Sequence, residues 1–296
     1  MISGSIVAIV TPMHADGAID YDSLQKLIDW HVDSGTDAIV SVGTTGESAT
    51  LNHDEHCEVI TRTIEFAAGR LPIIAGTGAN STSEAIALTR FAAKAGADAA
   101  LLVTPYYNKP TQEGLFQHYR VISEAVDIPQ ILYNVPGRTA VDMGVDTVIR
   151  LSELPNIVGL KEAAADGPER VAVLREACGN DFALYSGNDD TARQFVLNGG
   201  NGVISVTANV APAEMHRMIA AALAADRETA AMVDEKLALL HGQGALDVDQ
   251  LTAAVADSAR YDVFELVDTA LESPLGQIAM IPMLAWIANS APANLK

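Results

Sequence analysis

Lys161 is the residue whose surroundings point most directly to chemistry. It follows the apolar run IVGL at residues 157–160, and apolar surroundings disfavour the charged ammonium form of a lysine. A neutral amine can attack a carbonyl carbon. Lys161 is therefore a candidate Schiff-base lysine, which would convert a keto acid into an imine and then into an enamine nucleophile. The alternative is a structural lysine paired with a carboxylate such as Glu162 or Glu47.

Other polar side chains could assist such a lysine. Tyr133 ends an earlier apolar run, and its hydroxyl could carry protons to and from a carbinolamine, helped by hydroxyls such as those of Thr44 and Tyr107. Arg138 follows in the segment YNVPGRT at residues 133–139, and its planar guanidinium can bind a carboxylate through two hydrogen bonds. The alternatives are a tyrosine that only fills space and an ordinary surface arginine.

A small turn adds a possible anion site. The loop GTTGE at residues 43–47 offers backbone N–H groups and two hydroxyls in a concave turn that suits a carboxylate. Taken alone, this short pattern is a weak motif. It becomes informative only if the fold brings it close to Lys161.

The elements that must position these residues are short, β-branched and apolar. Such runs lie at residues 6–10, 38–42, 72–75, 99–103, 130–133, 157–160, 182–185 and 202–206. Their continuous apolar character predicts strands that are buried on both faces, as in a parallel sheet. Helical patterns lie between the runs. One of them, at residues 81–95, begins with Ser81 and Glu84 spaced as a capping box. Eight such units predict an α/β fold, a (β/α)8 TIM barrel with a C-terminal helical extension.

In such a barrel the active site lies at the C-terminal ends of the strands. The polar residues named above follow apolar runs, so we expect them to meet at one rim. We expect residues 1–225 to form the catalytic barrel and residues 226–296 the helical extension. Further helices are predicted at residues 213–225, 228–241, 248–259 and 261–271. The apolar segment at residues 278–287 contains Pro282 and has about half the length of a membrane span.

Composition excludes several classes of partner. The 296 residues carry 18 basic and 38 acidic side chains, a formal net charge of −20, which repels phosphate backbones and anionic lipid headgroups. We therefore expect no nucleic-acid partner and no membrane partner. Two cysteines, Cys57 and Cys178, are too few to suggest a disulfide framework. The first residues lack the basic region of a signal peptide, so a cytoplasmic location is expected.

Three segments taken together resemble the dihydrodipicolinate synthase family. They are GTTGE at residues 43–47, YNVPGRT at 133–139 and KEA at 161–163, and the likeness runs from GSIVAIVTP at 4–12 to about His241. The resemblance implies condensation of pyruvate with aspartate 4-semialdehyde, the committed step toward lysine and diaminopimelate. It implies no metal and no organic cofactor.

The resemblance also assigns roles to residues. Lys161 would form the imine with pyruvate, and the proton relay would include a tyrosine delivered by a neighbouring subunit. The residues implied as catalytic are Lys161, Tyr133, Thr44 and Tyr107. Thr45 would hold the pyruvate carboxylate and Arg138 that of the semialdehyde. The residues implied to bind substrate are Thr45, Arg138, Ile204 and Gly187.

Feedback and assembly are further implications of the resemblance. A site for the inhibitor lysine would comprise Ser48, Ala49, His53, His56, Gly78, Asn80, Glu84 and Tyr106. The expected assembly is a homo-oligomer, a tetramer built as a dimer of dimers. A zinc site at His53, His56 and Cys57 is a weaker alternative, because three ligands crowded at the start of a helix make a poor metal site.

The resemblance weakens after residue 241. The family has a Pro-rich stretch there, and this chain reads GQGALDVDQ at residues 242–250, so the extension is atypical. Two alternatives stay open. Sialic acid lyases share the loop, the tyrosine and the lysine, which permits a lyase acting on 2-keto acid sugars, but they usually lack the equivalent of Arg138. The second alternative is a catalytically silent barrel that binds an amino acid.

Overall fold

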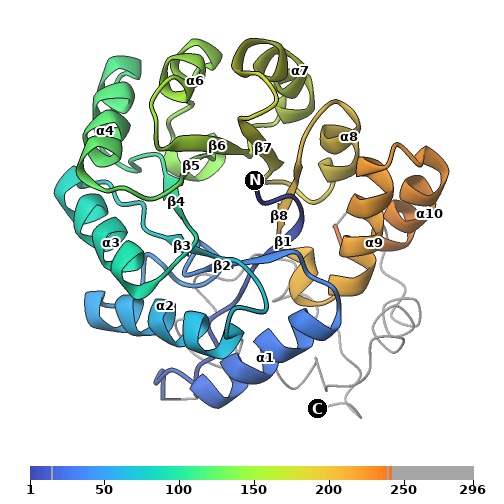
Figure 1. Cartoon of the computed structure of the whole chain (residues 1–296), viewed down its shortest axis with the longest axis horizontal. Coiled ribbons are helices and arrows are strands. Elements are labelled where there is room, and N and C mark those ends of the chain that lie inside the picture. The colour runs from blue at the N-terminus through green and yellow to red at the C-terminus, as the bar shows by residue number, and fades with distance from the viewer. Residues whose placement is uncertain (15, 239, 242–296) are drawn as a thin grey trace.

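Strands and helices alternate along the chain, as the spacing of the apolar runs predicts. The computed structural model describes residues 1–14, 16–238 and 240–241. In these residues eight parallel strands close into a barrel in chain order, and helices form a ring around it (Figure 1). The predicted (β/α)8 TIM barrel is confirmed. The strands are β1 (Gly4–Ala8), β2 (Ala38–Ser41), β3 (Ile73–Gly76), β4 (Ala99–Val103), β5 (Gln130–Asn134), β6 (Ile157–Glu162), β7 (Ala183–Ser186) and β8 (Gly202–Ser205).

Two strands, β1 and β6, do not end where their apolar runs end. β1 begins at Gly4 and ends at Ala8, although the apolar run continues through Ile9 and Val10. The Val10 N–H leaves the sheet pattern and donates to Asn209 Oδ1 at 3.1 Å. In contrast, β6 extends beyond its apolar run and includes Lys161. The backbone of Lys161 is therefore held by the hydrogen bonds of the sheet.

The barrel closes where β1 pairs with β8. Gly4 and Gly202 are register partners. Gly202 has φ +154°, and a Cβ atom at this position would overlap the Gly4 carbonyl oxygen. Glycine is required here because the two backbones approach too closely for any side chain.

Helices connect and surround the strands. They are α1 (Tyr21–Asp33), α2 (His53–Ala67), α3 (Thr82–Ala95), α4 (Gln112–Ala125), α5 (Pro136–Thr139), α6 (Val145–Ser152), α7 (Gly167–Cys178), α8 (Ala192–Leu197), the 3₁₀ turn η1 (Thr207–Asn209), α9 (Pro212–Leu223) and α10 (Arg227–Leu237). The predicted capping box at Ser81 is wrong, since its side chain bonds no backbone group of α3 and its Oγ lies 3.0 Å from Ser83 Oγ. A capping box does begin α2, between Asn52 and Glu55.

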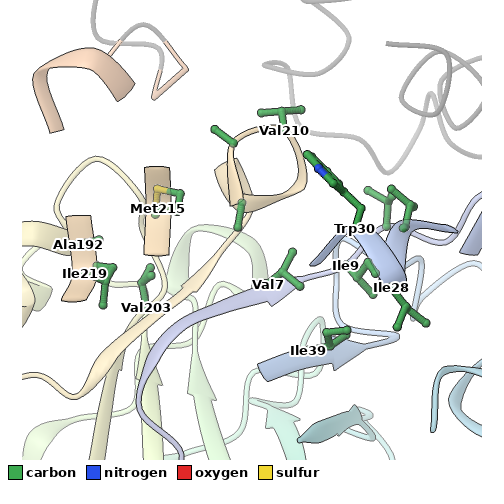
Figure 2. Packing of buried hydrophobic residues seen from close by; sticks show 14 of the residues in the cluster. Val7, Ile9, Ile28, Trp30, Ile39, Ala192, Val203, Val210, Met215 and Ile219 are labelled. Carbon is green, nitrogen blue, oxygen red and sulfur yellow. The ribbon is translucent and has the colours of Figure 1, made fainter. Parts of the chain in front are cut away.

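The apolar core has an inner and an outer part. Alternate strand residues such as Ile6, Val40 and Leu101 form one cluster that fills the barrel. The intervening residues pack against the helices. Figure 2 shows part of this outer layer, in which Val7 of β1 and Trp30 of α1 are buried. A filled barrel leaves its two ends as the places where polar side chains can gather.

The chain continues after the eighth strand with α9 and α10. α10 buries Ala230, Val233 and Leu237 in the outer core, and an ion pair of 2.7 Å joins its Asp234 to Arg193 of α8. The division into a barrel and an extension at residue 225 stays a prediction. The helices predicted at 248–259 and 261–271 and the apolar segment at 278–287 lie outside the described residues. No helix in the described ranges combines the length and apolar character needed to cross a bilayer.

Candidate active site

Lys161 and Tyr133 lie side by side at the C-terminal end of the barrel. They are register partners on β6 and β5, and they are 5% and 6% exposed. Lys161 Nζ lies 4.4 Å from the centroid of the Tyr133 ring, a distance at which the face of an aromatic ring attracts a cation. The tyrosine therefore contacts the amine directly, and its hydroxyl belongs to the same end of the barrel.

No carboxylate pairs with Lys161 in the described part of the chain, so the alternative of a structural ion pair is wrong for both partners considered. Glu162 follows Lys161 in an extended strand, and its side chain therefore lies on the opposite face. There its Oε1 accepts a hydrogen bond of 2.8 Å from the Ala164 N–H. Glu47 is buried, and its carboxylate accepts a hydrogen bond from the Thr50 hydroxyl. The amine of Lys161 is left available for another group.

Gly187 leaves room for the lysine side chain. Its N–H donates to the Glu162 carbonyl oxygen at 2.7 Å, which brings the loop after β7 against the end of β6. A Cβ atom at Gly187 would lie 3.1 Å from Lys161 Cε and 2.7 Å from Ala163 Cβ. The absence of a side chain is therefore what gives Lys161 its space.

The turn at residues 43–47 directly follows β2 and lies at the same rim. The Gly43 carbonyl oxygen accepts from the Gly46 N–H at 3.0 Å, and the Thr11 hydroxyl, beyond β1, donates to the Gly46 carbonyl oxygen at 2.8 Å. Thr44 and Thr45 are half-buried in this turn. The barrel thus positions Thr44 and Thr45 at the same end as Lys161.

The other predicted site residues share the rim but differ in exposure. Ile204 of β8 is fully buried in the cluster inside the barrel. Arg138 lies in α5, directly after β5, and is exposed. Tyr107 follows β4, is 90% exposed and has φ +73°. In the described residues no hydrogen bond connects Tyr133, Thr44 and Tyr107, so the chain by itself does not complete the predicted relay.

Sequence reasoning missed a polar network on the outer side of this rim. Asn134 Nδ2 donates to Glu162 Oε1 at 2.9 Å and to Asp142 Oδ1 at 2.8 Å. Arg170 reaches the same carboxyl of Asp142 from α7. Burial raises the pKa of Glu162 to about 7. The available signal was that polar residues directly follow Tyr133 and Lys161 in strands that are otherwise apolar.

Asp189 is a second residue that the sequence reasoning missed. Its Oδ2 accepts hydrogen bonds of 2.9 Å from the backbone N–H groups of Val206 and Thr207. This carboxylate connects the loop after β7 to the segment after β8. The backbone beside Ile204 is therefore held by a charged side chain.

Part of the predicted lysine site comes together between β3, α2 and the loop after β4. Burial lowers the pKa of His56, whose Nε2 lies 2.7 Å from the Gly76 carbonyl oxygen. Burial, followed by the nearby charge of Glu84, raises the pKa of Tyr106. Asn80 Nδ2 donates to the Tyr106 carbonyl oxygen at 3.4 Å. His56 is buried and Asn80 and Tyr106 are half-buried, and the one carboxylate of the group, that of Glu84, is exposed at the start of α3.

The other residues predicted for the lysine site lie in neighbouring segments. Ser48 and Ala49 lie in the turn after β2, and His53 is exposed at the start of α2. Gly78 has no space for a side chain, because a Cβ atom would overlap the Val103 backbone. Of the two His56 ring nitrogens that could bind zinc, Nε2 is already engaged by the Gly76 carbonyl oxygen. No cluster of three metal-ligating side chains occurs in the residues that the structure describes.

The fold and the site define a class of (β/α)8 barrel proteins with a buried amine at the C-terminal end of the sixth strand. Residues 1–277 match the model of the Dihydrodipicolinate synthetase family. The chain belongs to this family, and the resemblance noted in the sequence is confirmed.

Named relatives agree with this assignment. A 4-hydroxy-tetrahydrodipicolinate synthase of Thioalkalivibrio sulfidiphilus is 64% identical over 241 residues, which cover 81% of this chain and 82% of the relative. The crystal structure of the chloride-inhibited dihydrodipicolinate synthase from Acinetobacter baumannii complexed with pyruvate is similar with TM-score 0.81 and 54% identity, covering 87% of this chain and 89% of that one. The enzyme from Cyanidioschyzon merolae with lysine bound has TM-score 0.80 and 36% identity, covering 97% and 99%.

Proposed function

We propose that this chain is a 4-hydroxy-tetrahydrodipicolinate synthase that joins pyruvate to aspartate 4-semialdehyde through an imine on Lys161. The observation that carries the proposal is the buried amine of Lys161, which contacts the Tyr133 ring and pairs with neither Glu162 nor Glu47. An amine in such a position can act as a nucleophile toward a carbonyl carbon. The curated relatives that carry this name support the same activity.

The reaction assigns a task to each predicted group. Lys161 Nζ attacks the ketone carbon of pyruvate, water leaves the carbinolamine, and an imine forms. Loss of a methyl proton gives an enamine, whose carbon forms a bond to the aldehyde carbon of the semialdehyde. The amino group of the semialdehyde then displaces Lys161 and closes the ring. Tyr133 and Thr44 would move the protons of these steps, as positioned hydroxyls do.

Substrate carboxylates require their own partners. Thr45, with the backbone N–H groups of the turn at residues 43–47, would hold the carboxylate of pyruvate. Arg138 is exposed beside the rim, and its guanidinium would hold the carboxylate of the semialdehyde through two hydrogen bonds. Gly187 and the backbone of Ile204 would border the pyruvate.

The imine can be trapped directly. The protein would be incubated with pyruvate and sodium borohydride, which reduces the imine to a stable secondary amine, and its intact mass would be measured. We expect one pyruvate adduct on the native chain and none on Lys161→Ala. Product formation with aspartate 4-semialdehyde, and none from N-acetylneuraminate, then distinguishes the synthase from a sugar-acid lyase. Absence of an adduct on folded native protein contradicts the proposal.

We further propose that the protein is a homo-oligomer, a tetramer built as a dimer of dimers. Tyr107 supports this, because its side chain is 90% exposed on left-handed backbone and its hydroxyl has no hydrogen-bond partner in the described residues. In a neighbouring subunit's site its hydroxyl would complete the proton relay. The cytoplasmic location stays a prediction from the sequence.

Feedback by lysine is the last part of the proposal. The cluster of His56, Glu84, Tyr106 and Asn80 offers a carboxylate and neutral polar groups, which suit a cationic amino acid. The likeness to an enzyme with lysine bound supports it. Added lysine should lower the rate of the native protein and should affect Glu84→Gln less, because the variant lacks the charge that would bind the ammonium group.

A further inference from the structure

The outer face of β5 and β6 carries a network directly behind the two residues that contact each other inside the barrel. Asn134 and Glu162 are register partners, one position after Tyr133 and Lys161. Asn134 is fully buried and Glu162 nearly so. Besides its bond to Glu162, Asn134 accepts a hydrogen bond of 2.9 Å at Oδ1 from the Met143 N–H. The two strands are thus connected to the chain that follows α5.

Arg170 of α7 completes the network. Its Nη1 and Nη2 donate to the two oxygens of Asp142 at 2.9 and 2.7 Å. Its Nη1 lies 3.6 Å from Glu162 Oε2, and its Nε lies 2.8 Å from Asp166 Oδ1. The Arg170 side chain is only 16% exposed. A two-bonded pair of arginine and carboxylate fixes geometry as well as contributing energy, so Asp142 is held at a defined place relative to β6.

The segment between these anchors carries Arg138. Residues 135–143 leave β5 after Asn134, form α5 and return to the network at Asp142. Within the segment the Thr139 hydroxyl donates to the Val135 carbonyl oxygen at 3.1 Å. Arg138 is exposed, and in the described residues no hydrogen bond or ion pair of its own fixes its side chain. Its place relative to Lys161 is therefore set by the two ends of the segment.

We propose that Asp142 and Arg170 are positioning residues for the second substrate: their ion pair holds the segment 135–143 so that Arg138 meets the semialdehyde carboxylate. The inference rests on the proposed function. It separates two steps of the reaction. Lys161 and Tyr133 belong to rigid strands, so formation of the imine with pyruvate does not depend on this pair. Binding of the second substrate does.

The test compares the two substrates in the same variants. In Asp142→Asn and Arg170→Met we expect the KM for aspartate 4-semialdehyde to rise by about 10- to 100-fold, the size of effect that a displaced positioning group produces. The KM for pyruvate and the extent of borohydride trapping should stay those of the native protein. Asp142→Asn is the milder variant, since Arg170 keeps its contacts with Asp166 and Glu162.

A matched control and a double variant sharpen the result. Asp234→Asn removes a comparable ion pair, with Arg193 at 2.7 Å, between α8 and α10, and it should change neither KM. If Asp142 acts through Arg138, then Asp142→Asn should have no further effect on the semialdehyde KM in an Arg138→Ala background. Additive effects in that double variant would overturn the inference.

The remaining outcomes are also decisive. Unchanged KM values in folded Asp142→Asn and Arg170→Met overturn the inference and leave the proposed function intact. If pyruvate trapping and semialdehyde affinity fall equally, the pair of Asp142 and Arg170 supports β5 and β6 in general. That result also overturns the inference. Failure of the native protein to trap pyruvate contradicts the proposed function itself, and with it this inference.

Discussion

Tyr133 and Lys161 are opposite each other across β5 and β6, and the lysine amine lies 4.4 Å from the centre of the tyrosine ring. The two side chains come from strands that are hydrogen-bonded along their length, so neither can move far without the other. The contact involves the face of the ring, which leaves the hydroxyl of Tyr133 free for substrate. The contact of the ring with the Lys161 side chain is thus separate from proton transfer by the hydroxyl.

Tyr133→Phe tests this separation. The variant keeps the ring beside Lys161 and loses only the hydroxyl. We expect kcat to fall by about 10²- to 10⁴-fold, the usual contribution of a positioned acid or base, with a near-native melting temperature. Steady-state kinetics and thermal unfolding measure both. Tyr119→Phe is the control, because the Tyr119 hydroxyl donates to the Leu102 carbonyl oxygen at 3.1 Å, away from the site. It should lower stability and leave kcat unchanged.

Gly187→Ala should slow imine formation. The added methyl group would press on Lys161 Cε and Ala163 Cβ, and overpacking of this kind costs about 1–3 kcal/mol in the free energy of unfolding. The rate of borohydride trapping with pyruvate measures displacement of the lysine. Gly137→Ala is the matched control, since a Cβ atom there has open space around it. Native trapping rates in Gly187→Ala would show that the site tolerates a side chain at this position.

Glu162 should make stability depend on pH. Burial raises its pKa from 4.5 to about 7, so between these values the folded protein holds a proton that the unfolded chain releases. The stabilisation that this proton gives to the folded protein is complete at pH values below the pKa of the carboxyl in the unfolded chain. It is lost as the pH rises through the folded-state pKa of about 7. Glu162→Gln stays neutral throughout. The difference in free energy of unfolding, native minus variant, should therefore fall by about 2–3 kcal/mol from pH ~5 to pH ~8. Urea unfolding at both pH values measures it, and a constant difference contradicts the prediction.

Tyr107 can be tested by mixing subunits. Tyr107→Phe should lack the relay in every site, and Lys161→Ala should lack the imine. If the tyrosine acts on a neighbouring copy, joint dissociation and reassembly of the two inactive proteins should restore part of the activity, because some sites then combine an intact Lys161 with an intact Tyr107. Each protein reassembled alone is the control. No recovery in confirmed mixed oligomers would contradict delivery of Tyr107 between subunits.

Periodicity was sufficient to predict the barrel but not the limits of its strands. The run at residues 6–10 is uniformly apolar, so nothing in it marks Ala8 as the end of β1. Beyond Ala8 the Ile9 N–H still donates to the Val40 carbonyl oxygen at 3.1 Å, and the next N–H, that of Val10, donates to Asn209, about two hundred positions later. The residues that follow Ala8 are apolar because they are buried in the outer core. Ile9 belongs to the same buried cluster as Val7 of the strand.

The candidate site likewise contains some residues that the sequence could identify and others that it could not. Lys161 and Tyr133 could be singled out because each is a polar residue at the end of an apolar run. The alternation of side chains in a strand already implied that Glu162 would face away from Lys161, so the ion pair could have been rejected from sequence. Asn134 carries the same signal, because it directly follows Tyr133 in a buried strand. Asp142 and Arg170 could not be found this way, since they lie outside the strands and resemble ordinary surface residues.

The pairing of β1 with β8 also has a consequence for synthesis of the chain on the ribosome. Gly4 finds its partner only at Gly202, and the Asn209 side chain, which accepts from Val10 and donates to the Ala8 carbonyl oxygen at 2.9 Å, follows later still. Until that point has emerged, β1 is an open edge that can pair with the wrong strand. The barrel can therefore close only after the segment that carries Gly202 has been synthesised, and unpaired strand edges before that point are prone to aggregation.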